Sequence, residues 1–182
     1  MKPKLKRSAT TRPRGRAISF RAIGTIRTPF RQPQGTPIQP AYAEDARGTV
    51  QIDPAFAAGL QDLQGFERIW LIYHLDRAAP ARLTLIPYRD TREHGVFATR
   101  APCRPNPIGL SCVQLLAVRG ARLEVAGVDM LDGTPLLDIK PYVPEFECFP
   151  KAKAGWLDAQ RVRRTRADRR FHDKQPRREQ AP

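Results

Sequence analysis

The sequence lacks the long apolar segments that mark membrane and secreted proteins. No apolar run approaches the roughly 18 residues that a membrane-spanning helix requires. The charged N-terminal residues 1–20 have no apolar stretch behind them, so they do not form a secretory signal. These absences predict a protein that neither spans a membrane nor enters the secretory route.

Cysteine and histidine are scarce as well. The three cysteines, Cys103, Cys112 and Cys148, form no CxxC pair. This spacing argues against a disulfide framework and a thiolate zinc site, and it is typical of a protein in a reducing cytoplasm. The three histidines form no HExxH motif, so the sequence gives little support for a catalytic metal. We therefore expect a cytoplasmic protein without a metal site.

No GxGxxG motif follows a predicted strand, which argues against a doubly wound nucleotide-binding fold. Instead, short apolar segments alternate with glycine and proline turns. Residues 54–63 place apolar side chains at helical spacing behind a proline. The expected strands are 17–27, 48–53, 67–76, 81–88 and 134–144, together with a hairpin over 111–131. The pattern predicts a mainly β fold, a small closed or nearly closed β-barrel with one or two short helices.

The net charge of +14 is concentrated at the two ends of the chain. Residues 1–16 hold seven Lys/Arg and no acidic residue, and residues 151–182 hold eleven Lys/Arg against four acidic residues. Residues 17–150 hold fourteen of each sign. The sequence thus predicts a neutral domain with basic N- and C-terminal extensions. Such extensions usually bind a polyanion, most often nucleic acid, although solubility or adaptation to salt is an alternative. The stretch 159–174 is consistent with a basic helix or with a segment that folds only on binding.

One proline-rich stretch predicts a rigid corner before a buried strand. Pro102, Pro105 and Pro107 fix their own φ angles and restrict the residues that precede them. Gly109, which follows, allows another group to approach the backbone closely. A corner of this kind can meet a ligand without an ordering cost, or it can simply connect two strands. The proline-punctuated loop 27–40 is similarly open to a functional or a purely structural interpretation.

Acidic residues gather in the otherwise apolar segment 129–147. Asp132 belongs to an LDGTP turn, where Asp and Gly supply the unusual φ values. Asp138 and Lys140 are two residues apart on a predicted strand and share one face. That pair is either a surface ion pair or a base held ionised beside a cation.

Four segments together resemble a known family in their order and spacing. These are "FRAIGTIRTPF", "GFERIWLIYHL", "GVFATRAPCRPNPIGLS" and "DMLDGTPLLDIKPYVPEF", within residues 18–149. They resemble the tRNA N6-threonylcarbamoyladenosine methyltransferases (TrmO/TsaA-like). The resemblance implies an S-adenosylmethionine-dependent enzyme that methylates N6 of threonylcarbamoyladenosine next to the anticodon of tRNA. It also implies a β-barrel methyltransferase domain over 17–150 that works as a homodimer, and other members continue into a further domain that helps with tRNA.

The resemblance implies a set of cofactor contacts on the matching positions. Where family members often show Pro-Arg-Gln this chain has Ile38 in the middle position, and where they often show His-Gln it has Asp76 and Arg77. Arg100 is suited to the carboxylate of the cofactor, and Leu110, Met130 and Leu131 are suited to its adenine. The expected cofactor contacts are Pro37, Ile38, Gln39, Asp76, Arg77, Arg100, Leu110, Val128, Asp129, Met130 and Leu131.

The chemistry of methyl transfer adds a hypothesis about a base. The target nitrogen belongs to a urea-like linkage and is a poor nucleophile while it keeps its proton, so a carboxylate base would help. Asp138 is the first candidate and Asp132 the second. Two alternatives stay open, namely a non-catalytic nucleic-acid-binding β-barrel and a methyltransferase of this fold with another substrate. Aromatic residues, at 8%, are few for a protein that binds nucleic acid by base stacking.

Overall fold

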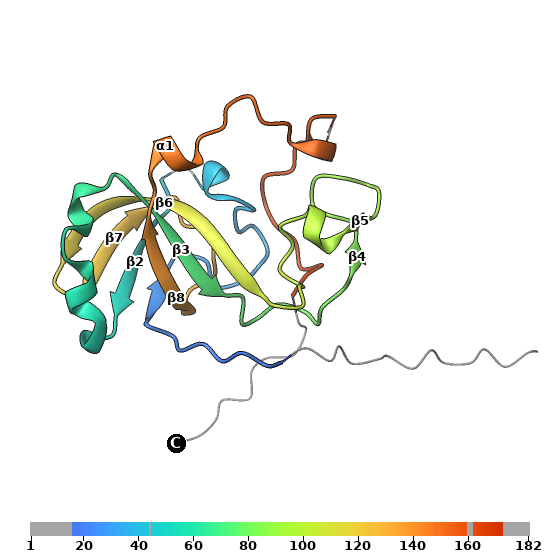
Figure 1. The fold of residues 1–182 in the computed structure, drawn as a ribbon. Coiled ribbons are helices and arrows are strands. Elements are labelled where there is room, and N and C mark those ends of the chain that lie inside the picture. The colour runs from blue at the N-terminus through green and yellow to red at the C-terminus, as the bar shows by residue number, and fades with distance from the viewer. Residues whose placement is uncertain (1–15, 44, 160–161, 173–182) are drawn as a thin grey trace, which may run out of the picture.

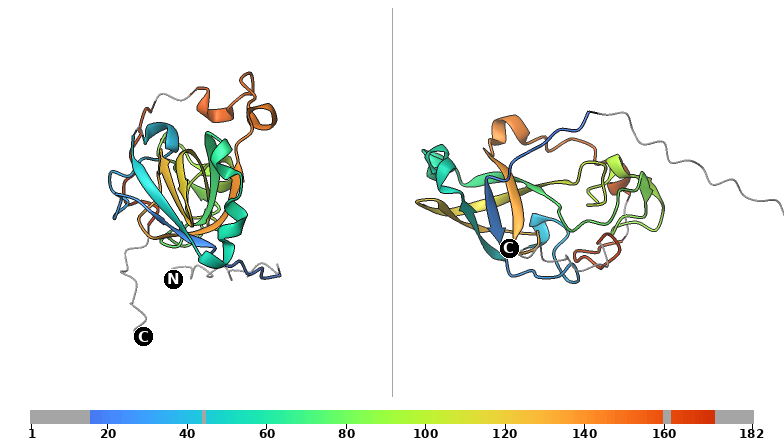
Figure 2. Two further views of the ribbon diagram at one scale, coloured as in Figure 1. Left: turned by 90° about the vertical axis from the view of Figure 1, so that its left-hand side faces the viewer. Right: turned by 90° about the horizontal axis from the view of Figure 1, so that it is seen from below.

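A computed structural model of the chain describes residues 16–43, 45–159 and 162–172. The basic N-terminal arm, apart from Arg16, lies outside the described residues, as do residues 173–182 of the basic tail. Six strands close into an antiparallel barrel in the order β1-β2-β7-β6-β3-β8 (Figures 1 and 2). They are β1 Gly24–Arg27, β2 Arg47–Ile52, β3 Arg68–His74, β6 Ile108–Arg119, β7 Arg122–Ala126 and β8 Thr134–Pro141. The predicted mainly β fold is confirmed.

Alternation along the strands fills the barrel. In β3, Ile69, Leu71 and Tyr73 point inward and are buried, while the residues between them face outward. The β6–β7 hairpin turns at Gly120, whose φ of 58° lies in the left-handed region that glycine adopts without strain. The strands predicted at 48–53, 67–76 and 134–144 and the hairpin over 111–131 are all present.

The predicted strand over 17–27 is present only in its last four residues. β2 pairs with β1 as far as the Ile52–Gly24 register and then ends before Pro54, which has no N–H to donate. Ile23 still donates to the carbonyl of Leu136 and accepts from the N–H of Asp53, but the residues before it have no continuing partner on the β2 side. Ile18 and Phe20, which alternate with polar residues in the predicted strand, are exposed.

The predicted helix at 54–63 is a pair of 3₁₀ helices, η2 Pro54–Leu60 and η3 Leu63–Gly65. Asp53 caps the first through a bond from the N–H of Ala55 to its carboxylate. Asp62, at a φ of 62°, separates the two. Their apolar spacing still serves the core, because Leu60 and Leu63 are buried inside the barrel cluster.

A small lobe packs beside the barrel (Figure 1, right-hand side). The predicted strand at 81–88 is reduced to β4 Thr84–Leu85, which pairs with β5 His94–Gly95 and is followed by η4 Val96–Ala98. This lobe has its own core of Leu85, Val96, Ala101, Cys103 and Phe171. Phe171 comes from the C-terminal tail, so the tail is part of the lobe.

The remaining elements are short. They are η1 Pro40–Tyr42, α1 Pro144–Glu147 and η5 Gly155–Leu157. Within the described residues the longest helix is η2 with seven residues, and none is long and apolar enough to cross a membrane. Residues 162–172 form a strap that contains no helix. The strap runs along the lobe and the loop 27–40.

Candidate functional site

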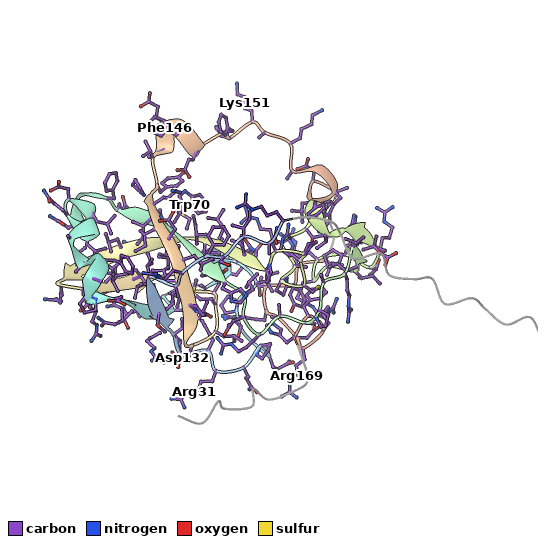
Figure 3. The ribbon with its side chains drawn as sticks, turned by 60° about the horizontal axis from the view of Figure 1, so that its bottom comes forward. Arg31, Trp70, Asp132, Phe146, Lys151 and Arg169 are labelled. Atoms are coloured by element: carbon purple, nitrogen blue, oxygen red, sulfur yellow. The ribbon has the colours of Figure 1, made fainter. Side chains whose placement is uncertain are left out.

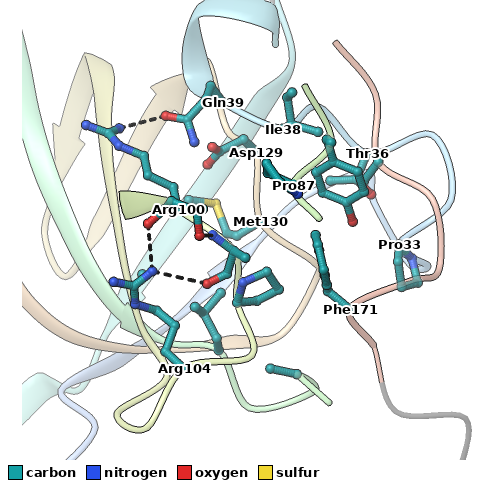
Figure 4. A pocket seen from close by; sticks show the side chains of 18 of the residues that line it. Pro33, Thr36, Ile38, Gln39, Pro87, Arg100, Arg104, Asp129, Met130 and Phe171 are labelled. Carbon is teal, nitrogen blue, oxygen red and sulfur yellow. Dashed lines mark hydrogen bonds between the residues drawn. The ribbon is translucent and has the colours of Figure 1, made fainter. Parts of the chain in front are cut away.

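A cavity of about 720 Å³ opens where the end of the barrel meets the small lobe and the strap (Figure 4). Ten of the eleven expected cofactor contacts line it. They come from five separate stretches of the chain and are Pro37, Ile38, Gln39, Asp76, Arg77, Arg100, Leu110, Asp129, Met130 and Leu131. The eleventh, Val128, is fully buried in the barrel core and does not line the cavity. Its packing against Gly48 fixes the backbone just before Asp129.

The loop 27–40 and the strap form one wall of the cavity together. Gly35 donates its N–H to the carbonyl of Ala167 at 3.0 Å, and Ala167 returns a bond to the carbonyl of Thr36 at 2.7 Å. Ile38 donates to the carbonyl of Thr165 at 3.0 Å. These backbone bonds hold the loop beside the expected cofactor contacts at 37–39, so it is a structured part of the site.

The proline corner forms the opposite wall, and Arg104 holds it together. The Arg104 guanidinium donates to the carbonyls of Val96, Thr99 and Ala101 at 2.8–3.3 Å. The carbonyl of Pro107 accepts from the N–H of Leu75 at the end of β3. The corner therefore fixes the backbone around Arg100 from both sides.

Arg100 is the cation of the corner that faces the cavity. Its side chain donates a hydrogen bond from Nη1 to Oε1 of Gln39 at 2.7 Å, and the residue is exposed (Figure 4). Arg77, by contrast, is bonded to Thr134 at 3.1 Å and ion-paired with Asp76 at 3.3 Å. Among these arginines, Arg100 has the most donor capacity left for an anionic ligand.

Two carboxylates line the cavity, and their surroundings differ. Asp76 is paired with the guanidinium of Arg77. Asp129 has no such ion pair within the described residues and accepts a bond from Oγ of Ser111 at 2.6 Å. Burial, partly offset by that bond and by the charge of Arg100, raises the pKa of Asp129 to about 7. A carboxyl with this pKa can take up or release a proton near neutral pH.

Ser111 is in turn bonded to Tyr73. The two hydroxyl oxygens lie 2.9 Å apart inside the barrel, and both residues are buried. Burial, with the nearby charge of Asp129, raises the pKa of Tyr73 well above its usual value, so the phenol keeps its proton. The tyrosine ring requires Gly109 opposite, because a Cβ there would lie 2.1 Å from Cε2 of Tyr73. Gly109 of the proline corner therefore leaves the space that the Tyr73 ring occupies.

The two residues predicted as general bases lie elsewhere. Asp138 forms an ion pair with Lys140 at 2.9 Å on partly exposed side chains of β8. Asp132 accepts a bond from the N–H of Thr28 and lies 3.8 Å from Arg27 (Figure 3). Neither lines the cavity, so the assignment of a base to either residue has no geometric support.

Sequence reasoning missed several residues of the site. In the sequence, Tyr73 and Ser111 look like ordinary inward-facing strand residues. Only their contact across β3 and β6 shows that their hydroxyl groups form a hydrogen-bonded pair. Trp156 donates its indole N–H to the carbonyl of Ala98 at 2.7 Å and stacks on His94 at 4.5 Å between ring centroids. No local signal marks that contact, because the paired residues are about 60 positions apart. Within the residues described, no group of three or more His, Cys, Asp or Glu side chains could hold a metal ion.

Comparison with known proteins identifies the family of the chain. The model of the tRNA-methyltransferase O N-terminal domain matches residues 25–148. A probable S-adenosyl-L-methionine-binding protein of Pyrococcus abyssi is 49% identical over 156 residues, which cover 85% of each chain. A tRNA (adenine(37)-N6)-methyltransferase of Escherichia coli is 35% identical over 79% of this chain and 65% of its own length.

A solved structure of a relative has a similar fold. The crystal structure of TrmO from Pseudomonas aeruginosa superposes with a TM-score of 0.66 at 38% identity, over 78% of this chain and 63% of that one. This chain therefore spans less than two thirds of that relative's length. The matched region, residues 25–148, contains all of the barrel strands except Gly24, together with all the expected cofactor contacts. The chain belongs to the tRNA-methyltransferase O family.

Proposed function

We propose that this protein is an S-adenosylmethionine-dependent tRNA methyltransferase that methylates N6 of threonylcarbamoyladenosine next to the anticodon. The observation that carries the proposal is the convergence of ten sequence-selected residues on one cavity. The names of the Pyrococcus and Escherichia coli relatives support the cofactor and the adenine-N6 chemistry. The threonylcarbamoyl group is the part of the proposal that comes from the family resemblance alone.

The residues of the cavity fit the cofactor chemically. Arg100 offers guanidinium donors to a carboxylate, and the side chain that it bonds in this structure is the neutral Gln39. Leu110, Met130 and Leu131 supply apolar surface for an adenine ring. When bound, S-adenosylmethionine supplies a methyl group on a positively charged sulfur, which leaves with the carbon–sulfur electron pair as a neutral thioether. The protein's part is to orient the reacting groups, which can account for a large share of the rate.

The first test is cofactor binding by calorimetry, with and without EDTA. We expect S-adenosylmethionine to bind equally well in both. Loss of binding in EDTA would show that a metal takes part and would contradict the proposal. Binding of tRNA without any binding of S-adenosylmethionine would favour the non-catalytic nucleic-acid-binding barrel.

The second test identifies the substrate. Nucleosides from the tRNA of a deletion strain, analysed by mass spectrometry, should lack the N6-methylated form of threonylcarbamoyladenosine and accumulate the unmethylated form. A gene copy restored in the strain should return the methylated nucleoside. An unchanged nucleoside profile would point to a methyltransferase of this fold with another substrate.

We also propose that the protein is a homodimer with the cavity near the interface. A second hollow on the outside of β3 and β6 shares Gln39 and Arg100 with the cavity and includes Trp70 and Tyr142. The apolar side chain of Phe146 is exposed and lies on the same side of the molecule as Trp70 (Figure 3). A partner covering this face would remove apolar surface from water next to the site. A monomer mass in light scattering at micromolar concentration would contradict the dimer.

A further inference from the structure

We propose that Asp129 is the proton acceptor of the methyl-transfer reaction and that Ser111 and Tyr73 position its carboxylate. The inference rests on the proposed function and names a catalytic residue for it. It begins from the two carboxylates of the cavity, because a base must reach the proton that it removes. Asp76 forms an ion pair with Arg77, with 3.3 Å between Oδ1 and Nε, whereas Asp129 accepts a hydrogen bond from the neutral hydroxyl of Ser111.

The direction of the hydrogen bonds follows from the donors available. An ionised carboxylate only accepts, so Ser111 donates its single hydroxyl proton to Oδ1 of Asp129. Tyr73 must then donate to Oγ of Ser111, and its phenol remains protonated. The relay therefore runs Tyr73 to Ser111 to Asp129. It fixes one carboxylate oxygen, and Ser111 is the only side chain that donates to Asp129 in the part of the chain described.

The groups around Asp129 give its carboxyl a pKa that suits a general base. Burial raises its pKa to about 7, while Ser111 and the charge of Arg100 lower it. The charged or titratable side chains that act on it are Arg100 from the proline corner and Tyr73 from β3. A general base is most effective when its pKa lies near the working pH.

The proton transfer balances. Oδ2 of Asp129 forms a new O–H bond with the proton of the substrate N6–H group. The electron pair of the broken N–H bond stays on the nitrogen and forms its bond to the methyl carbon. The protonated carboxyl afterwards loses its proton to solvent through the open cavity, which restores the base.

The test compares Asp129→Asn, Ser111→Ala and Tyr73→Phe with wild type, with Glu124→Gln as the matched control. Glu124 is a carboxylate on β7 that is ion-paired with Arg119 and does not line the cavity. Asp129→Asn should lower the single-turnover rate at saturating cofactor and tRNA by about 10²- to 10⁴-fold. Its dissociation constant for S-adenosylmethionine should change by less than about tenfold, which is about 1.4 kcal/mol. Glu124→Gln should change neither quantity.

A second readout does not depend on activity. Carbon-13 NMR of the Asp129 carboxyl should give a pKa near the elevated value in wild type. Ser111→Ala should raise that pKa further because the donor to the carboxylate is lost, and Tyr73→Phe should raise it by less. The pH at which the methyl-transfer rate reaches half its maximum should move upward in the same order.

The outcomes separate the two proposals. An active wild type with an equally active Asp129→Asn variant would overturn Asp129 as the base and leave the methyltransferase function in place. Cofactor affinity that falls as far as the rate would make Asp129 a cofactor ligand and would also overturn it. A wild type that binds S-adenosylmethionine but methylates no tRNA would overturn the proposed function, and the base assignment with it.

Discussion

The two arginines that flank the first proline of the corner have different partners, and their substitution should have different effects. Arg100 faces the cavity, and its guanidinium donates to the neutral side chain of Gln39. Arg104 donates to the backbone carbonyls of Val96, Thr99 and Ala101, which lie just before the proline corner. The same residue type, four positions apart, is therefore expected to bind ligand in one case and to stabilise structure in the other.

Arg100→Ala should weaken S-adenosylmethionine binding by about 1.5–3 kcal/mol in calorimetry, the range for a hydrogen bond to a charged group. Its melting temperature should stay near that of wild type, because no core contact is lost. Arg104→Ala should instead lower the free energy of unfolding by about 1–3 kcal/mol, because part-buried carbonyls lose their donor. Arg119→Ala, which removes an exposed pair, is the control. Equal cofactor affinity in wild type and Arg100→Ala would mean that another group holds the carboxylate.

Gly109 is needed for the space that it leaves, since an added methyl group would lie 2.1 Å from the Tyr73 ring. Gly109→Ala should destabilise the protein by about 1–3 kcal/mol, as overpacking in a core does, and should displace the Tyr73 hydroxyl from Ser111. Gly59→Ala is the matched control, because nothing lies within 4 Å of a Cβ at that position. Thermal unfolding of both variants checks this. A Gly109→Ala protein as stable as Gly59→Ala would show that the ring can move without cost.

At the scale of elements, the barrel strands could be predicted because alternation and turn residues encode them locally. β3, β6 and β8 each alternate buried and exposed positions or end at proline. The strap could not be predicted in the same way. The strap contains many arginines and shows no periodic pattern of apolar residues. Its conformation depends on backbone hydrogen bonds to residues about 130 positions earlier.

The two residues predicted as general bases do not line the cavity, and sequence spacing could not have shown this. Sequence spacing placed Asp138 and Lys140 on one strand face but could not show that the face points away from the cavity.

The strap should be held chiefly by Phe171, which is 2% exposed in the core of the small lobe. Phe171→Ala should release the strap and lower cofactor affinity, because Phe171 and Ala167 line the cavity. Hydrogen exchange should speed up at the N–H groups of Gly35 and Ala167, which pair across the loop and the strap, while β3 and β6 keep their protection. Leu157→Ala serves as the comparison, since Leu157 also lines the cavity but lies outside the lobe core. Unchanged exchange at Gly35 and Ala167 would show that backbone bonds alone secure the strap.

At the scale of the whole molecule, the neutral barrel carries the cavity and the two ends carry the charge. The strap shows that part of the basic tail folds onto the domain, with exposed Arg163 and Arg166 beside the cavity wall. Arg169 donates to Gln32 on the loop 27–40, so it also lies on this side (Figure 3). These positions would present cations to the phosphates of a tRNA whose modified base enters the cavity.

Salt dependence of tRNA binding tests this arrangement. Each phosphate that a cation neutralises releases condensed counterions, so the logarithm of affinity falls with the logarithm of salt concentration by about 0.9 per contact on a duplex. Deleting residues 1–16, which hold seven Lys/Arg, should reduce that slope by roughly 2–4, because not every charge needs to engage. Arg163→Ala/Arg166→Ala should reduce it by up to about 2. Neither change should alter the affinity for S-adenosylmethionine, since Arg163 and Arg166 do not line the cavity and the expected cofactor contacts all follow residue 36 in the sequence. The control is Arg119→Ala/Arg122→Ala, which removes two cations at the far end of β6 and should leave the slope as it is. If the extensions only improve solubility, all four proteins will share one slope, and tRNA binding will have to depend on other residues of the domain.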